Sequence, residues 1–477
     1  MPVSEICSLA AVEMAALIRR GQLSAREVVE AHLAQIERVN PTVNALVTLV
    51  ADRAADQAGK ADEDQARGLP LGPLHGLPVA HKDLFDTAGV RTTYGSPVYR
   101  DYVPAQDAIS VERIRGAGAI ILGKTNTPEF GAGSQTFNPV FGATRNPYDL
   151  SKTCGGSSGG SAVALACGMT ALADGTDTGG SLRNPAAFCG VVGLRPAPGR
   201  VPEFALPNPW STLNVSGPMG RTVADAALLL SVMAGPDPRC PIAIGEPGGR
   251  FAERLERDFH GTRVAWFRNL AGVPFDRRVL QAVNARRQVF EDLGCVVEEA
   301  EPDLSGAEDA FQILRAWGFA AKFAALVRDH RDLVKDTIIW EVERGAKLDS
   351  AEIARALAFK AEVWNRMRLF FERYEYFILP TSQVPPFDVD QPYVTEIEGV
   401  AMTSYIDWMK SCYWISLAEN PAISVPCGFT PEGLPIGLQI VGRHRDEWSV
   451  LQLAHAFEEA TRADRRAPLL SRPTVAP

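Results

Sequence analysis

The sequence predicts an α/β protein built as one large domain. Amphipathic helical patterns alternate with short apolar strand-like runs, the alternation that builds sheets covered by helices. The 477 residues are 46% hydrophobic and 22% charged, as in ordinary folded proteins. No repeat, low-complexity linker or change of composition divides the chain, so residues 1–477 are interpreted as a single domain.

The individual elements follow from periodicity and from start and stop signals. Ser24 and Glu27 form a capping box before an apolar helical pattern, which predicts a helix that ends near Asn40 and Pro41. Other helices are expected over 51–67, 108–115, 161–173, 222–234 and 275–293, and 304–376 is strongly helical in composition. Short apolar strands are expected to run into Lys82 and to cover 119–123, 189–194, 261–267, 376–380, 421–426 and 434–442.

Charge and cysteine usage exclude several classes of function. The net charge of −9 and the scattered basic residues disfavour nucleic-acid binding. The N-terminal segment lacks the positive start and apolar run of a secretory signal, and the eight cysteines show no zinc-site spacing, so a cytoplasmic protein with reduced thiols is expected. The charge-free run 153–173 begins with Gly and Ser and is interpreted as a loop entering a buried helix, not a membrane span.

Two glycine-flanked serine motifs are the most informative feature: GGSSGGS at 155–161 and TDTGGSLR at 176–183. Glycine lets backbone N–H groups approach a ligand closely, as phosphate loops and oxyanion holes require. No Lys follows these glycines in the position of a Walker loop, and the G-x-G-x-x-G dinucleotide pattern is absent. Phosphate binding is therefore disfavoured.

The first motif also satisfies G-x-S-x-G, the nucleophile elbow of α/β-hydrolases, with Ser157 at its centre. That elbow requires a strand before it and a histidine late in the chain. Residues 146–154 have loop composition, and the late histidines, His444 and His455, fit a turn and a helix. A Ser-His-Asp esterase is kept as a less favoured alternative.

An ordered set of motifs resembles the amidase signature family from about residue 5 to 460. The motifs are GLPVAHKD, AGAIILGKTNTPEF, TRNPYDLSKTCGGSSGGSA, DGTDTGGSLRNPAAFCGVVGLRP, GPMGRTVADAALLL and PAISVPCGF with GLPIGLQIVG. The resemblance is densest over 70–235, the signature core, with 304–376 as a helical embellishment. It implies a mixed central β-sheet covered by helices on both faces, and no metal or cofactor.

The resemblance also implies a catalytic triad: Ser181 as nucleophile, Ser157 as proton relay and Lys82 as base, with a cis peptide bond between Gly156 and Ser157. The implied oxyanion hole consists of the backbone N–H groups of Thr178, Gly179, Gly180 and Ser181. Ser158 is expected to support the site, and Asp177 and Arg183 are interpreted as a pair that braces the turn.

Elementary chemistry agrees with these roles. A serine hydroxyl needs an adjacent base, and a lysine serves as base only when burial keeps it neutral. Ser157 can pass a proton because a hydroxyl both donates and accepts. Lys124, which also follows an apolar strand, is the rival base, although the family pattern does not use it. His81 and Asp83 are expected to face away from Lys82, since neighbours on a strand point to opposite faces.

The predicted function is hydrolysis, through an acyl-enzyme, of a small-molecule amide, with anilides, carbamates and esters left open. The alternative is the glutaminase subunit of a tRNA-dependent amidotransferase, which the sequence IIWEVERGAKL disfavours because that subfamily has a basic stretch there.

Four aromatic residues are candidates for lining a substrate pocket, with core packing as their competing role: Phe130, Phe137, Trp210 and Trp317. A homodimer is the default oligomer. Asp174 departs from the family pattern, which has a small or apolar residue there.

Overall fold

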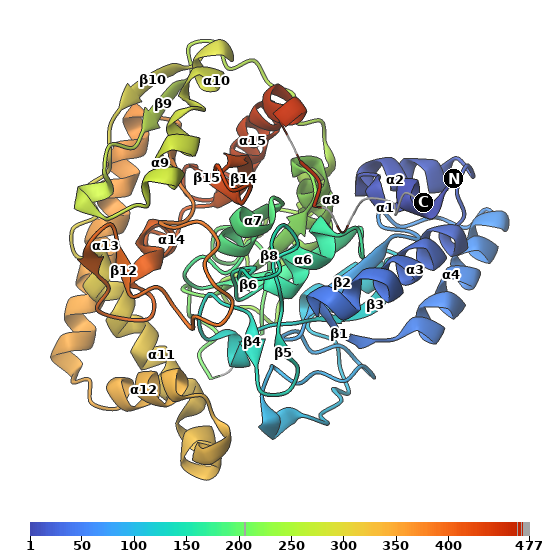
Figure 1. Ribbon diagram of the computed structural model, residues 1–477, viewed down its shortest axis with the longest axis horizontal. Coiled ribbons are helices and arrows are strands. Elements are labelled where there is room, and N and C mark those ends of the chain that lie inside the picture. Colours follow the sequence, from blue (N-terminus) through green and yellow to red (C-terminus); the bar gives the residue numbers. More distant parts are fainter. Residues whose placement is uncertain (205–206, 465, 469, 471–477) are drawn as a thin grey trace.

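One eleven-stranded sheet forms the centre of the computed structural model, which describes residues 1–204, 207–464, 466–468 and 470 (Figure 1). In spatial order its strands are β1 (Leu46–Leu49), β3 (Ile120–Thr125), β2 (Pro78–Lys82), β6 (Leu172–Asp177), β8 (Val215–Gly220), β7 (Val192–Arg195), β14 (Ala422–Phe429), β15 (Pro435–Val441), β11 (Tyr376–Pro380), β9 (Arg263–Trp266) and β10 (Val296–Glu299). β2 runs parallel to β3 and β6, whereas β6 and β8 are antiparallel. The sheet is therefore mixed, as predicted.

Helices connect the strands throughout the chain. They are α1 (Val3–Ser8), α2 (Ala11–Arg19), α3 (Ala25–Val43), α4 (Ala51–Ala66), α5 (Ile109–Gly116), α6 (Gly159–Ala166), α7 (Arg183–Cys189), α8 (Val223–Met233), α9 (Arg277–Asn284), α10 (Arg287–Asp292), α11 (Ala307–His330), α12 (Asp336–Gly345), α13 (Ser350–Arg373), α14 (Lys410–Leu417) and α15 (Glu447–Thr461). Two small hairpins, β4 (Phe137–Asn138) with β5 (Gly142–Ala143) and β12 (Glu396–Ile397) with β13 (Val400–Ala401), lie outside the main sheet.

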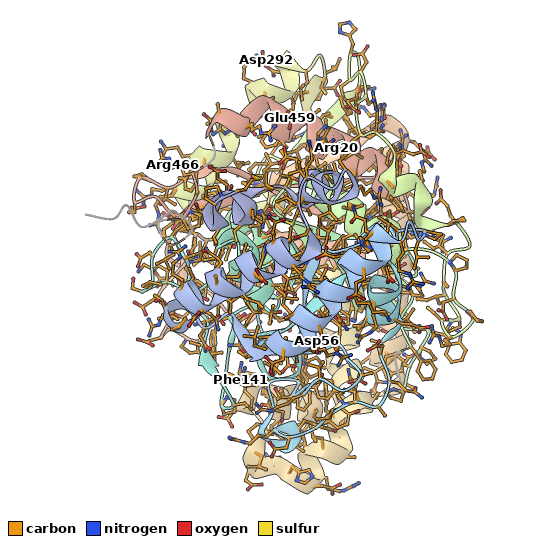
Figure 2. The ribbon with its side chains drawn as sticks, turned by 90° about the vertical axis from the view of Figure 1, so that its right-hand side faces the viewer. Arg20, Asp56, Phe141, Asp292, Glu459 and Arg466 are labelled. Atoms are coloured by element: carbon orange, nitrogen blue, oxygen red, sulfur yellow. The ribbon has the colours of Figure 1, made fainter. Side chains whose placement is uncertain are left out.

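Both faces of the sheet are buried under helices. Val79 and Leu172 belong to a hydrophobic cluster that includes α8, whereas their neighbours Ala80 and Ala173 belong to a second cluster with α3, α4 and α6. This alternation is the strand periodicity of two, here with an apolar layer on each side. Figure 2 shows α3 and α4 side by side on the outside of the second layer. The predicted fold class is confirmed.

The structure corrects several predicted boundaries. The helix expected over 161–173 ends at Ala166, and β6 begins at Leu172 and continues through Gly175. A glycine is needed there because a Cβ at Gly175 would lie 2.4 Å from Ser158 Oγ. The strand expected from residue 189 starts at Val192, after the unforeseen helix α7. The helix expected to stop near Pro41 continues to Val43, and 275–293 divides into α9 and α10.

The region 304–376 is helical, as predicted, and forms α11, α12 and α13. Within the described ranges, only the helical segment Ala307–Leu333 is long and apolar enough to cross a membrane, by length and composition alone. Its Phe311, Leu314 and Phe323 are buried against protein. These contacts are those of a helix that packs within the molecule.

Candidate active site

The side chain of Lys82 extends from the end of β2 into a set of hydroxyl groups. It is fully buried. Its Nζ lies within hydrogen-bond distance of the hydroxyl oxygens of Ser157 (2.7 Å), Ser158 (3.0 Å) and Thr176 (2.9 Å). Thr176 comes from β6, the parallel neighbour of β2, and sequence reasoning missed it although it lies within the second glycine-rich motif. The sheet thus places hydroxyl groups of strand β6 and of the loop before α6 around the amine of Lys82.

Burial makes the neutral form of the Lys82 amine accessible near neutral pH. Burial lowers the pKa of Lys82 to about 7, and the carboxylates of Asp177 and Asp174 oppose this shift. A neutral amine has two N–H groups and one lone pair, so two of its three hydroxyl partners accept and the third can donate to nitrogen. Ser157, with the shortest of the three distances, is placed to deliver its proton to Lys82.

The two glycine-rich segments are joined at Ser158 and Ser181. The peptide bond between Gly156 and Ser157 is cis. The N–H of Ser158 donates to the carbonyl oxygen of Ser181 over 3.2 Å. Ser181 is half-buried at the end of its turn, while Ser157 is 1% exposed. The structure therefore brings together the segments that carry Lys82, Ser157 and Ser181.

The turn after β6 presents backbone N–H groups, with one correction to the expected set. Gly180 N–H donates to Asp177 Oδ1 (2.8 Å), so it is not available to an oxyanion. The N–H groups of Thr178, Gly179 and Ser181 donate to none of the residues that the structure describes. A Cβ at Gly179 would lie 3.0 Å from the ring of Phe311, so a larger residue at this position would require the ring to move. Three amides of the turn are left free for a ligand oxygen.

A buried ion cluster holds this turn. Both carboxylate oxygens of Asp177 accept from Arg183, over 2.9 and 3.0 Å, and Arg195 Nη1 lies 3.3 Å from Oδ1. The two guanidinium groups hold the pKa of the Asp177 carboxyl well below its usual range, against the effect of burial. Arg183 also donates to Ser416 Oγ (2.7 Å) and Gln439 Oε1 (2.5 Å). Sequence reasoning missed Arg195, whose one signal is its place at the end of an apolar strand.

Replacing Asp177 by Asn is expected to lower the free energy of unfolding by about 3 kcal/mol, because it leaves two buried guanidinium groups without their counter-ion. Urea unfolding monitored by circular dichroism measures this loss. The matched control is Asp390→Asn at an exposed position, which is expected to change stability by less than about 0.5 kcal/mol. Equal stability of the two variants would show that Asp177 does not hold the turn.

The four aromatic candidates are dispersed. Phe130 packs on Phe323 at a ring distance of 4.9 Å and precedes Gly131, where a Cβ would lie 3.3 Å from Ser157 Oγ. Phe137 lies under Lys335 Nζ, 4.5 Å from the ring centre. Trp210 and Trp317 are 68% and 38% exposed. Phe137 follows Thr136, whose hydroxyl donates to the carbonyl oxygen of Gly155 over 2.8 Å, so Phe130 and Phe137 both lie next to residues that contact the loop of Ser157. The two tryptophans are the more exposed candidates.

The late histidines do not form a second catalytic set. His444 Nδ1 lies 3.2 Å from the carbonyl oxygen of Glu419, and its ring contacts Trp364. His455 lies on α15, 4.0 Å from Glu458. At Ser157 the basic group within hydrogen-bond distance is Lys82. This geometry disfavours the Ser-His-Asp alternative.

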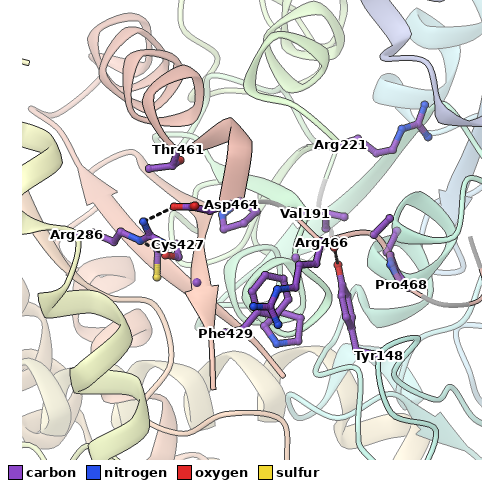
Figure 3. A pocket seen from close by; sticks show the side chains of 16 residues that line it. Tyr148, Val191, Arg221, Arg286, Cys427, Phe429, Thr461, Asp464, Arg466 and Pro468 are labelled. Carbon is purple, nitrogen blue, oxygen red and sulfur yellow. Dashed lines mark hydrogen bonds and ion pairs between the residues drawn. The ribbon is translucent and has the colours of Figure 1, made fainter. Parts of the chain in front are cut away.

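A separate cavity of about 190 Å³ lies between β14 and the C-terminal segment (Figure 3). Its arginines are already engaged: Arg286 pairs with Asp464 over 2.6 Å, and Arg466 lies over the ring of Phe429. Tyr148 donates to the carbonyl oxygen of Arg466. Lys82, Ser157 and Ser181 are not among the residues that line this cavity, so it is not part of the candidate site.

Comparison with known proteins gives the family. The Amidase family model matches residues 27–451. An acylamidase of Rhodococcus erythropolis is 38% identical over 94% of this chain and 95% of its own, and a subunit of the glutamyl-tRNA(Gln) amidotransferase of Geobacillus kaustophilus is 37% identical over 96% and 98%. The crystal structure of a bacterial aryl acylamidase of the amidase signature family superposes with a TM-score of 0.89 at 30% identity, over 95% and 96% of the two chains. The chain therefore belongs to the amidase signature family and is a hydrolase of carbon–nitrogen bonds in amides.

Proposed function

We propose that this enzyme hydrolyses small acyl amides through an acyl-enzyme on Ser181, with Ser157 as relay and Lys82 as base. The observation that carries the proposal is the buried Lys82 amine, 2.7 Å from Ser157 Oγ. The three free amides of the turn after β6 support it, because they can hold the oxygen on which negative charge develops. The acylamidase relative supports an acyl amide as substrate.

The proposed reaction balances its protons through the relay. As Ser181 Oγ forms a bond to the amide carbon, Ser157 takes its proton and passes its own to neutral Lys82. The carbonyl electrons move to oxygen, which the amides of the turn stabilise. When the carbon–nitrogen bond breaks, the Lys82 ammonium returns a proton through Ser157 to the leaving amine. Water then attacks the ester by the same route and releases the acid and Ser181.

Activity is expected to rise with pH and to reach half of its maximum near pH 7. The reason is that burial lowers the pKa of Lys82 to about 7, and the protonated amine cannot accept a proton. Measurement of kcat/KM on an anilide from about pH 5 to about pH 9 gives the profile. Assays after return to neutral pH control for acid inactivation. A profile without an acid limb would contradict the role of Lys82.

The glutaminase component of an amidotransferase is the second candidate, and the relative from Geobacillus kaustophilus favours it. Such a component works on glutamine as part of a complex, whereas an acylamidase acts on acyl amides. The purified chain is therefore assayed by itself on glutamine and on a simple anilide. If the chain hydrolyses the anilide but not glutamine, the result supports the acylamidase function. If it hydrolyses glutamine but not the anilide, the result supports the second candidate.

A panel of an aliphatic amide, an anilide, a carbamate and an ester tests the substrate class, with Ser181→Ala as the blank. A small alkyl fluorophosphonate is expected to label Ser181, as mass spectrometry of the peptide would establish. Substantial labelling of another residue would overturn the assignment of the nucleophile.

We infer further that the protein is cytoplasmic and homodimeric. Its eight unpaired, buried thiols support a cytoplasmic location, and light scattering of the purified protein tests the dimer.

A further inference from the structure

Asp174 places a carboxylate inside the sheet, directly behind the catalytic lysine. It is fully buried on β6. Its Oδ1 accepts the backbone N–H of Lys82 over 2.9 Å, and its Oδ2 lies 2.6 Å from Nδ1 of His81. A charge in the interior of a sheet is costly unless hydrogen bonds compensate it. Both oxygens of Asp174 are thus satisfied by β2, the strand that ends in Lys82.

His81 contacts Asp174 through one of its two ring nitrogens. Nδ1 donates to Asp174, while Nε2 has no partner among the residues described. His81 therefore orients the Asp174 carboxyl group.

The other charged groups around this point are already paired. Asp177 is balanced by Arg183 and Arg195. Lys124, which pairs in register with His81, lies 4.0 Å from Asp83, and Asp107 is bound by Arg115 over 2.8 Å. The helix α6, which packs on β2, contributes no charged side chain. Asp83 and Asp174 both oppose the lowering of the Lys124 pKa by burial, so Asp174 acts on Lys124 as well as on Lys82. Among the described residues it forms no ion pair with a lysine or an arginine.

We propose that Asp174, oriented by His81, is a positioning residue that fixes the end of β2 and supplies the negative charge against which the Lys82 amine exchanges its proton. The inference rests on the proposed role of Lys82 as the base. It explains why a carboxylate occupies a position where the sequence pattern has a small or apolar residue. The carboxylate favours the protonated amine, so it sets the lowest pH at which the enzyme works.

The test compares pH profiles of Asp174→Asn and wild type. Asparagine keeps the Oδ1 acceptor for the Lys82 N–H but removes the charge. The acid limb of kcat/KM is expected to move to lower pH by about one unit, since a neighbouring carboxylate no longer favours the ammonium form. The pH dependence of Ser181 labelling by the fluorophosphonate is expected to move in parallel. A purely structural role would lower the rate with an unchanged midpoint, and this result overturns the inference.

Asp83→Asn is the matched control, because Asp83 is equally buried beside Lys82 but faces Lys124. It is expected to leave the midpoint of the acid limb unchanged. Should Asp174→Asn not fold, the double variant Asp174→Ser with His81→Leu removes both partners and leaves no unpaired ring. The same shift is expected of it, and a wild-type midpoint in this folded variant overturns the inference.

Failure of this inference is distinguishable from failure of the proposed function. If Lys82→Met or Ser181→Ala retains wild-type activity, the triad itself is wrong and Asp174 has no base to position. If both variants lose activity while Asp174→Asn keeps the wild-type midpoint, the triad stands and only the role of Asp174 falls. The fluorophosphonate experiment separates these cases without knowledge of the natural substrate.

Discussion

Ser181→Ala is expected to lower kcat by about 10,000-fold or more, because it removes the atom that would form the acyl-enzyme while leaving the fold intact. The turn is held by Asp177 and the two arginines, and the hydroxyl of Ser181 makes no hydrogen bond to the described residues, so stability should change little. Initial rates on the best amide of the panel measure the loss.

Ser231→Ala is the matched control for this variant. Ser231 is also half-buried, but its hydroxyl donates only within α8, to the carbonyl oxygen of Leu228. Its kcat is expected to stay within about twofold of wild type, as for substitutions away from a reacting centre. If Ser181→Ala kept activity comparable with Ser231→Ala, the nucleophile would lie elsewhere, and Ser157 would be the next residue to replace.

Lys82→Met is expected to reduce kcat/KM by on the order of 1,000-fold, the range for loss of a general base. The matched control is Lys124→Met. Lys124 is equally buried at the end of the adjacent parallel strand, and burial lowers the pKa of Lys124 to about 8. Its Nζ, however, donates to Thr87 (2.9 Å) and Thr92 (3.1 Å) rather than to a serine.

Lys124→Met is therefore expected to keep kcat/KM within about tenfold of wild type but to lower the free energy of unfolding by about 3 kcal/mol, since Asp83 loses its cation. Comparison of the two lysine variants thus distinguishes a loss of catalysis from a loss of stability. Parallel measurements of kcat/KM and urea unfolding on both variants check this. A larger catalytic loss for Lys124→Met than for Lys82→Met would exchange their roles.

The main elements of the fold follow from local patterns in the sequence. The strand into Lys82 was predictable because an apolar run meets a charge, and α3 because of its capping box. Strand β6 was not predictable, because Gly175 and two aspartates interrupt its apolar pattern. Its strand conformation depends on pairing with β2 and β8. Strand identity there is decided by distant partners.

Some residues of the candidate site were likewise predictable from local sequence patterns, and others were not. Ser157 and Ser181 are marked by glycines next to them, so their motifs are visible in the sequence. Thr176 lies in a visible motif and Arg195 ends an apolar strand, but their contacts with the site depend on strand pairing and on buried charge, which these local patterns do not specify. The unavailability of the Gly180 amide also depends on geometry, because the orientation of Asp177 alone decides it. The tryptophans could not be placed because aromatic residues serve cores and pockets alike.

The contacts of Arg183 have a consequence for biosynthesis. This arginine links the turn that carries Ser181 to Ser416 on α14 and to Gln439 on β15, segments translated more than 200 residues later. A nascent chain that already contains Lys82, Ser157 and Ser181 therefore lacks two of the partners that fix the turn. We expect the enzyme to gain its hydrolytic activity only once β15 has been synthesised and has joined the sheet, so that incomplete chains on the ribosome are inert.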